Sequence, residues 1–208
     1  MTVDFIELSD EERAARAERL AAGPIPGGQT IWYFLDPEQG VRNGGRDPEA
    51  DHCASVWKDG NGKVWWTCDC VALTVYSQGW CRRPRAFLEY VQGGRGSINT
   101  DSMLLDAKDT QSVCMPLTMP RRGCVITMPS VREPDGSRAT PGHTGVVVGV
   151  DDRFDPHKPD LRLLRVAHAS PANHRRFGQA IGITDGTVFG SRDYRFLTFR
   201  RSPLTTGS

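Results

Sequence analysis

The sequence has almost no excess of either charge. Its 26 Lys and Arg residues stand against 25 Asp and Glu residues, for a formal net charge of +1. A chain so nearly neutral has no strong field that would attract nucleic acid or an anionic membrane surface. Pairs of arginines occur, but no aromatic residues alternate with them. We therefore expect no nucleic acid among its partners.

Long hydrophobic runs are missing as well. No stretch approaches the ~20 apolar residues that a transmembrane helix needs, so no membrane insertion is expected. The first residues, Met1–Phe5, lack the basic start and apolar run of a secretory signal. We expect a protein made in the cytoplasm that would leave it only by another route, such as lysis or a virion.

Without a signal, disulfides are not expected either. Six cysteines are present, enough for three disulfides in a secreted chain, but free thiols are the better interpretation here. Hydrophobic residues make up 38% of the chain, which is enough for a core. The cysteines are Cys53, Cys68, Cys70, Cys81, Cys114 and Cys124.

No internal repeat or low-complexity tract divides the 208 residues, a length that suits one domain with a short extra arm. Ser9 and Glu12 form a capping box, so the Ala-rich residues 10–22 predict a short exposed helix. We divide the chain into an N-terminal helical arm, 1–28, and a main domain, 29–208. Residues 25–62, which cross this boundary, read as loop with one short strand at Thr30–Leu35.

An apolar run from Cys70 to Trp80 predicts a buried helix, and a second helix is expected at Asp101–Ala107. Between the later strands, 129–142 has the composition of a mobile loop. Helices first and antiparallel strands afterwards are typical of an α+β domain. The expected strands are Cys124–Met128, Thr144–Val150, Leu161–Ala167 and Tyr194–Arg200.

Cys70 is the first candidate for chemistry. Asp69 is a plausible N-cap, which would place Cys70 in the first turn of the apolar helix. Unpaired amides and the helix dipole favour an anion there, so a nearby histidine would help to form a thiolate. A thiolate is the nucleophile that acyl transfer needs. A lone cysteine is nevertheless more often a small core residue, so the histidines matter.

Two histidines stand at the ends of a predicted hairpin. If the strands at 143–150 and 161–168 pair with equal arms, Val150 faces Leu161 and His143 faces His168 on the same side of the sheet. One ring could then act as a base while the other fixes its orientation. We expect the start of the Cys70 helix to pack against this face, with a thiolate–imidazolium pair between Cys70 and His143.

These motifs resemble the NlpC-type cell-wall peptidases, a bacterial and phage branch of the papain-like cysteine peptidases. The run from Asp69 to Thr74, Asp-Cys-Val-Ala-Leu-Thr, is similar to the family's Asp-Cys-Ser-Gly-Leu-Val helix start. His-Thr-Gly-Val at 143–146 is similar to its His-Val-Gly-Ile strand, and Ala-His-Ala-Ser at 167–170 to its Ile-His-Ala-Ser run. Pro-Arg-Arg-Gly-Cys-Val-Ile-Thr at 120–127 is similar to the strand before the base.

The resemblance spans about residues 65–200. It implies a papain-like fold in which the nucleophile helix packs on a central antiparallel sheet, and a catalytic triad of Cys70, His143 and His168. It also implies hydrolysis of peptide bonds in peptidoglycan stems, in phage lysis or entry, without metal or cofactor. Candidate substrate-binding residues are Asp69, Trp66 and Tyr33.

The chain departs from the family pattern at Val71-Ala72, which stand where Ser-Gly is usual, and at Gly123-Cys124, which replace Gly-Asp. Other interpretations stay open. The same triad would serve an amidase or acyltransferase, and an inactive structural subunit could keep the fold. A zinc site could use the side chains of His52, Cys53, Cys68 and Cys70, although their spacing is unlike that of structural zinc sites.

Overall fold

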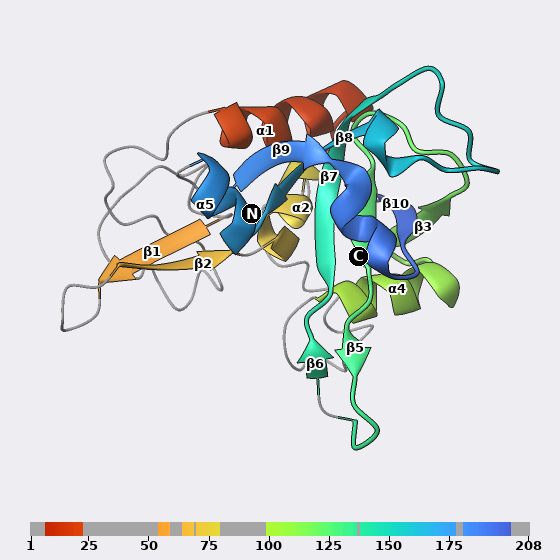
Figure 1. Ribbon diagram of the computed structural model, residues 1–208. Helices are drawn as coiled ribbons and strands as arrows, with labels where there is room; N and C mark the ends of the chain where they lie inside the picture. The colour runs from red at the N-terminus through yellow and green to blue at the C-terminus, as the bar shows by residue number, and fades with distance from the viewer. Residues whose placement is uncertain are drawn as a thin grey trace, which may run out of the picture.

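A computed structural model gives the fold of this chain and describes residues 7–22, 54–58, 64–68, 70–79, 99–136, 138–177 and 181–200. Its centre is a six-stranded, fully antiparallel sheet in the order β3-β10-β4-β7-β8-β9. Helices and strands occur together, which confirms the expected α+β class (Figure 1). The strands of this sheet are β3 (Cys114–Leu117), β4 (Val125–Met128), β7 (His143–Val150), β8 (Leu164–Ala169), β9 (Ile181–Asp185) and β10 (Arg195–Phe199).

The two middle strands, β4 and β7, are buried on both faces. All four residues of β4 are buried, and so are the five residues 144–148 of β7. The Val-Val-Val run of β7 suits this position because β-branched side chains pack well on a pleated surface that is covered on both sides.

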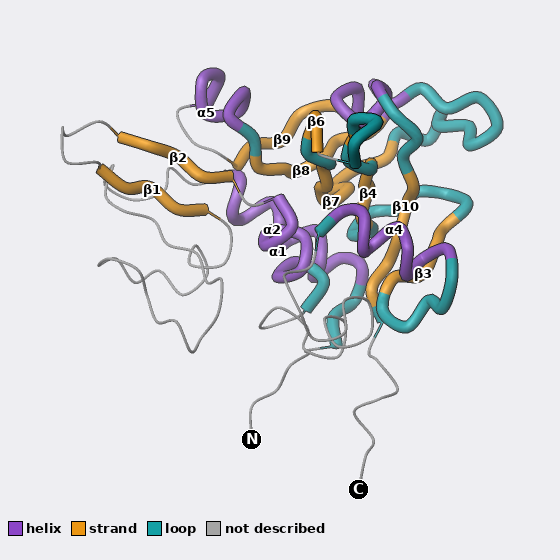
Figure 2. The backbone as a smooth tube through the Cα atoms, turned by 90° about the horizontal axis from the view of Figure 1, so that it is seen from below, coloured by secondary structure: helices purple, strands orange, loops and turns teal. Residues whose placement is uncertain are grey.

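One face of the sheet is covered by α1 (Asp10–Ala22), α2 (Cys70–Ser77) and α4 (Thr100–Lys108). Val75 of α2 and Met103 of α4 pack with Val125 and Leu197 of the sheet, while α1 packs on β7 and β8. The tube drawing shows the three helices on the same side of the strands (Figure 2). Because α2 is apolar over most of its length, it suits burial between the sheet and its neighbours.

The opposite face is covered by two 3-10 helices, η4 (Leu161–Leu163) and η5 (Gly186–Ser191), and by the chain around Phe154. Phe189 of η5 is fully buried and packs in one cluster with Phe154, Val147 and Val166. The two faces of β7 therefore meet different partners: Val146 and Val148 face the helices, and Val147 faces the 3-10 side.

The predicted bounds of the first helix, residues 10–22, are confirmed by α1. The prediction that this helix is exposed is wrong. Ser9 and Glu12 form the expected capping box, with the Ser9 amide donating to Glu12 Oε2 at 2.7 Å and the Glu12 amide to Ser9 Oγ at 3.3 Å. Ala14 and Ala17 are fully buried against β7 and β8. A helix with small residues on one face can approach a sheet closely, so α1 contributes to the same core as the strands. The proposed boundary at residue 28 lies outside the described residues.

The predicted helices at 70–80 and 101–107 are present as α2 and α4, and the strand at 124–128 is present as β4. The run 161–167 was only partly right, because its first three residues form η4 and the strand starts at Leu164. The elements β2 (Val64–Cys68), β3, β9 and η5 and the short helix α5 (Pro171–Phe177) were not predicted either.

Two segments read as loop contain strands. β1 (Ala54–Lys58), at the end of the predicted 25–62 loop, pairs with β2 (Val64–Cys68). Within the predicted loop 129–142, β5 (Val131–Arg132) pairs with β6 (Arg138–Thr140), and this hairpin projects below the sheet next to the start of β7 (Figure 1). Thr30–Leu35 lies outside the described residues. No helix in the described parts of the chain is both long and apolar enough to cross a membrane.

Candidate active site

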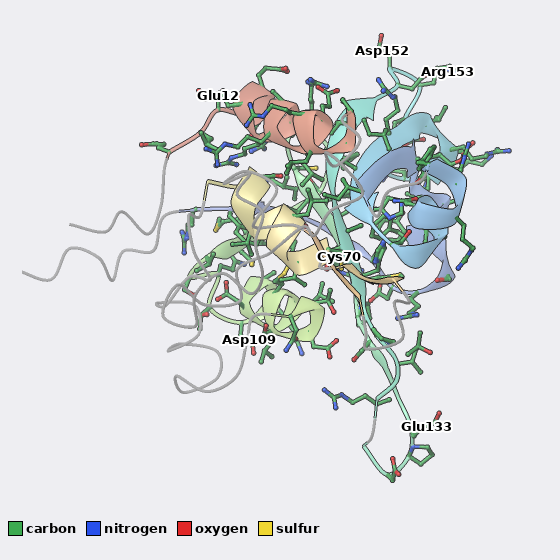
Figure 3. All side chains as sticks on the ribbon, turned by 90° about the vertical axis from the view of Figure 1, so that its left-hand side faces the viewer. Glu12, Cys70, Asp109, Glu133, Asp152 and Arg153 are labelled. Atoms are coloured by element: carbon green, nitrogen blue, oxygen red, sulfur yellow. The ribbon has the colours of Figure 1, made fainter. Side chains whose placement is uncertain are left out.

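Cys70 is the first residue of α2, as the sequence predicts. It is half-buried and its sulfur is a thiol, not part of a disulfide. Figure 3 shows it at the end of α2 that lies nearer the β5–β6 hairpin. Asp69, the proposed N-cap and substrate-binding residue, lies outside the described residues.

Two sets of hydrogen bonds place α2 alongside β7, and both show that the helix and the strand run in the same direction. The Thr74 hydroxyl lies 3.3 Å from the Thr144 hydroxyl and donates to the Cys70 carbonyl oxygen at 2.9 Å. Directly after the last residue of α2, the side-chain amide of Gln78 donates to the Gly123 carbonyl at 2.7 Å, and the Gly123 backbone amide donates to the Val147 carbonyl oxygen. The helix therefore starts at the end of β7 where His143 stands.

His143 and His168 form a hydrogen bond. The distance from His143 Nε2 to His168 Nδ1 is 2.9 Å, and the two rings are nearly perpendicular, at 89°. The predicted meeting of the two histidines is present, although their predicted pairing is not: Val146 pairs with Ala167, so His168 stands two positions from the place opposite His143.

The shift of two residues has two local causes. Val150 pairs with Leu164 instead of Leu161, because η4 takes three residues out of the strand. A bulge between Val147 and Gly149 then offsets one of these three. An even shift keeps both histidines on one face, and diagonal neighbours in a sheet are still within reach of long side chains.

Gly145 allows this diagonal contact. Continuing the observed pairing by one residue puts Gly145 opposite His168, and a Cβ at Gly145 would stand only 3.0 Å from His168 Cβ and 2.8 Å from the Ala167 carbonyl oxygen. Because glycine has no side chain, β7 and β8 can bring the two rings together here.

His168 is almost fully enclosed, with 3% of its surface exposed. Its Nε2 lies 2.8 Å from the hydroxyl of Thr184 on β9, and Thr184 donates to the Asp185 carbonyl oxygen at 2.9 Å. The buried side chain of Asn173 on α5 holds the backbone, since its amide donates to the His168 carbonyl at 2.7 Å. His168 is thus fixed in position on both sides of its ring and at its backbone.

The surroundings keep both imidazoles uncharged at neutral pH. Burial, the neighbouring His168 and Arg192 together lower the pKa of His143 from 6.5 to about 3. Burial lowers the pKa of His168 to about 4. Phe189 stacks on the His143 ring with the centroids 5.1 Å apart, which adds to its apolar cover. The expected thiolate–imidazolium pair requires a charged His143, whereas these surroundings favour the neutral ring.

The face on which the histidines stand also differs from the expected one. Thr144 faces α2, so His143, its neighbour along the strand, points to the other side of the sheet and meets Phe189 of η5. The start of α2 therefore does not pack against the histidine face. Any contact between Cys70 and His143 has to form around the N-terminal end of β7.

Arg192, which the sequence analysis did not select, holds this end of the sheet. Its Nη1 donates to the carbonyl oxygens of Pro129 and Pro141, at 2.6 and 2.9 Å, and so joins the two chains that lead into the β5–β6 hairpin. Thr184 was also missed. Neither has a sequence signal, because each acquires its contacts only through folding.

The remaining predicted site residues are not brought into the site by the described structure. Trp66 belongs to β2, whose side chains are not described, and Tyr33 lies outside the described residues. Among the described residues, no group of three or more His, Cys, Asp or Glu side chains could hold a metal ion. The zinc alternative also involves His52 and Cys53, which lie outside those residues.

Comparisons of the chain with protein families, with curated proteins and with solved structures each find no match. The function must therefore be inferred from the site itself. Its parts are a thiol at the start of α2 and a hydrogen-bonded pair of neutral histidines, His143 on β7 and His168 on β8, at the N-terminal end of β7.

Proposed function

We propose that the protein is a papain-like cysteine peptidase that hydrolyses peptide bonds in peptidoglycan stem peptides, in phage lysis or cell entry. One observation carries the proposal: the hydrogen bond between His143 and His168 at the start of β7, beside the end of α2 that bears Cys70. The order of these residues along the chain supports it, as do a helix and an antiparallel sheet that hold them.

In this mechanism His143 acts as a general base. As the Cys70 sulfur attacks the scissile carbonyl carbon, its proton passes to His143, and the first amides of α2 stabilise the oxyanion. His143 then gives the proton to the leaving amine, and an acyl-enzyme thioester remains. Water, deprotonated by His143, hydrolyses the thioester and regenerates the thiol. His168 holds the His143 ring throughout.

Purified peptidoglycan tests the proposal, with mass analysis of the soluble fragments. Wild-type protein should release fragments with new amino and carboxyl ends inside the stem peptides. Cys70→Ala should abolish release while the protein stays folded, because a first-turn cysteine supplies a nucleophile more than packing. Cys68→Ala, two residues earlier, is the matched control and should keep most activity.

A thiol-reactive acyl probe separates the alternatives. Labelling of Cys70 without release of fragments would replace the peptidase by an amidase or acyltransferase acting on another acyl substrate. If neither fragments nor labelling occurred, an inactive structural subunit would be the better description. Activity in Cys70→Ala but not in Cys68→Ala would contradict the assignment of the nucleophile.

A further inference from the structure

Three residues on neighbouring strands form a continuous polar row. His168 on β8 pairs directly with Gly182 of β9, so Thr184, two residues further along, is a diagonal neighbour of His168 on the same face. His143 occupies the corresponding diagonal position on the other side, on β7. His168 therefore has one partner for each ring nitrogen.

The hydrogen atoms of this row can be assigned by counting. A carbonyl oxygen only accepts, so the contact between Thr184 and the Asp185 carbonyl uses the single hydrogen of the Thr184 hydroxyl. The Thr184 oxygen must then accept from His168, whose Nε2 carries the hydrogen. A neutral imidazole has one N–H, which leaves His168 Nδ1 as an acceptor.

The same counting continues to His143. Because His168 Nδ1 accepts, His143 Nε2 must donate across the 2.9 Å contact. The second nitrogen of His143, Nδ1, is then left with its lone pair. Reversing the Thr184 hydroxyl would reverse every donor in the row and place a hydrogen on His143 Nδ1, where it could no longer accept a proton.

We infer that Thr184 is a positioning residue: its hydroxyl, anchored on the Asp185 carbonyl, fixes the tautomers of His168 and His143 so that His143 Nδ1 is the basic atom of the site. Thr184 touches no substrate in this scheme and acts only through the two rings. The role of Thr184 in catalysis rests on the proposed peptidase function. The assignment of the two tautomers does not, because it follows from the hydrogen bonds alone.

Nuclear magnetic resonance of the imidazole nitrogens tests the tautomers in the intact protein at neutral pH. Long-range proton–nitrogen correlation spectra show which nitrogen of each ring is protonated, and His143→Gln and His168→Gln assign the signals. In the wild-type protein both rings should carry hydrogen on Nε2. Thr184→Val keeps the side-chain shape but removes the hydroxyl, so hydrogen should move toward Nδ1 in both rings. Thr184→Ser should restore the wild-type spectrum.

Thr187→Val is the matched control. Thr187 is an exposed residue of the same turn whose hydroxyl donates to the Asp185 carboxylate and not to a histidine ring, so this change should leave both tautomers unaltered. Wild-type tautomers in Thr184→Val, or Nδ1–H rings in the wild-type protein, would overturn the inference.

Kinetics on peptidoglycan fragments add a second readout. Thr184→Val should lower kcat about tenfold or more with KM unchanged, because a misplaced hydrogen weakens the base without altering substrate contacts. Thr184→Ser should recover most of kcat. If the tautomers respond as expected but even the wild-type protein hydrolyses nothing, the peptidase proposal fails and the assignment of the hydrogens stands. Unchanged kcat in an active Thr184→Val protein would refute the positioning role.

Discussion

The buried histidine pair should make the protein unusually sensitive to mild acid. In the native state the pKa of His143 is lowered to about 3 and that of His168 to about 4, mainly by burial, while an unfolded chain keeps both near 6.5. As the pH falls below 6.5, the unfolded state binds protons that the native state does not. Stability from this pair is therefore complete above pH 6.5 and is lost on acidification toward pH 4 and 3.

The size of the effect follows from these pKa values. A pH of 5.0 is about 1.5 units below the pKa of a histidine in the unfolded chain, and each unit corresponds to about 1.4 kcal/mol. Keeping one buried histidine neutral at pH 5.0 therefore costs about 2 kcal/mol of stability. Between pH 7.5 and 5.0 we expect the pair to lower the free energy of unfolding by about 4 kcal/mol, a large part of the total for a domain of this kind.

Urea unfolding followed by tryptophan fluorescence at the two pH values measures this difference. His168→Gln removes one of the two groups and should reduce the loss by about half, whatever its own stability at pH 7.5. His143→Gln provides an independent second variant. The control is His157→Gln, which changes an exposed loop histidine and should leave the loss as in the wild-type protein. Equal losses in the wild-type protein and in both buried-site variants would refute the reasoning.

Three further predictions concern the site and the core. Peptidase activity should survive EDTA and be lost to iodoacetamide, since the proposed mechanism uses a thiol and no metal; loss with EDTA that zinc restores would favour a cysteine–histidine metal site. A crystal structure should place the Cys70 sulfur ~3–4 Å from a ring nitrogen of His143. A separation of more than about twice that distance, with no motion that closes it, would contradict the mechanism. Ala17→Leu should lower the free energy of unfolding by about 1–3 kcal/mol, because Ala17 is fully buried against the sheet, while Ala15→Leu on the exposed side of α1 should change it little in the same urea titration.

Elements set by local signals could be predicted from the sequence. The capping box of Ser9 and Glu12 identifies the start of α1, and the apolar run after Asp69 identifies α2 with Cys70 as its first residue. The Val-Val-Val run identifies β7 as a buried strand. These features depend on near neighbours in the chain, which is why a sequence is enough to find them.

The meeting of His143 and His168 was predicted for a reason that holds only in part. The alternation of a strand fixes the face of each side chain, and an even error in pairing leaves that face unchanged. The pairing itself depends on η4 and on the bulge after Val147, and no local pattern indicates either of them. The predicted contact between the two histidines is therefore present, although the predicted register of β7 and β8 is wrong by two residues.

By itself the sequence determined where α1, α2 and β7 begin and which side chains could do chemistry, since capping and periodicity act over a few residues. Only the tertiary structure decided that the histidines face η5 and not α2, that α1 is part of the core, and that Thr184 completes the row behind His168. These contacts join residues on different strands and helices. They depend on strand pairing and on the packing of side chains, which are fixed only when the whole sheet has formed.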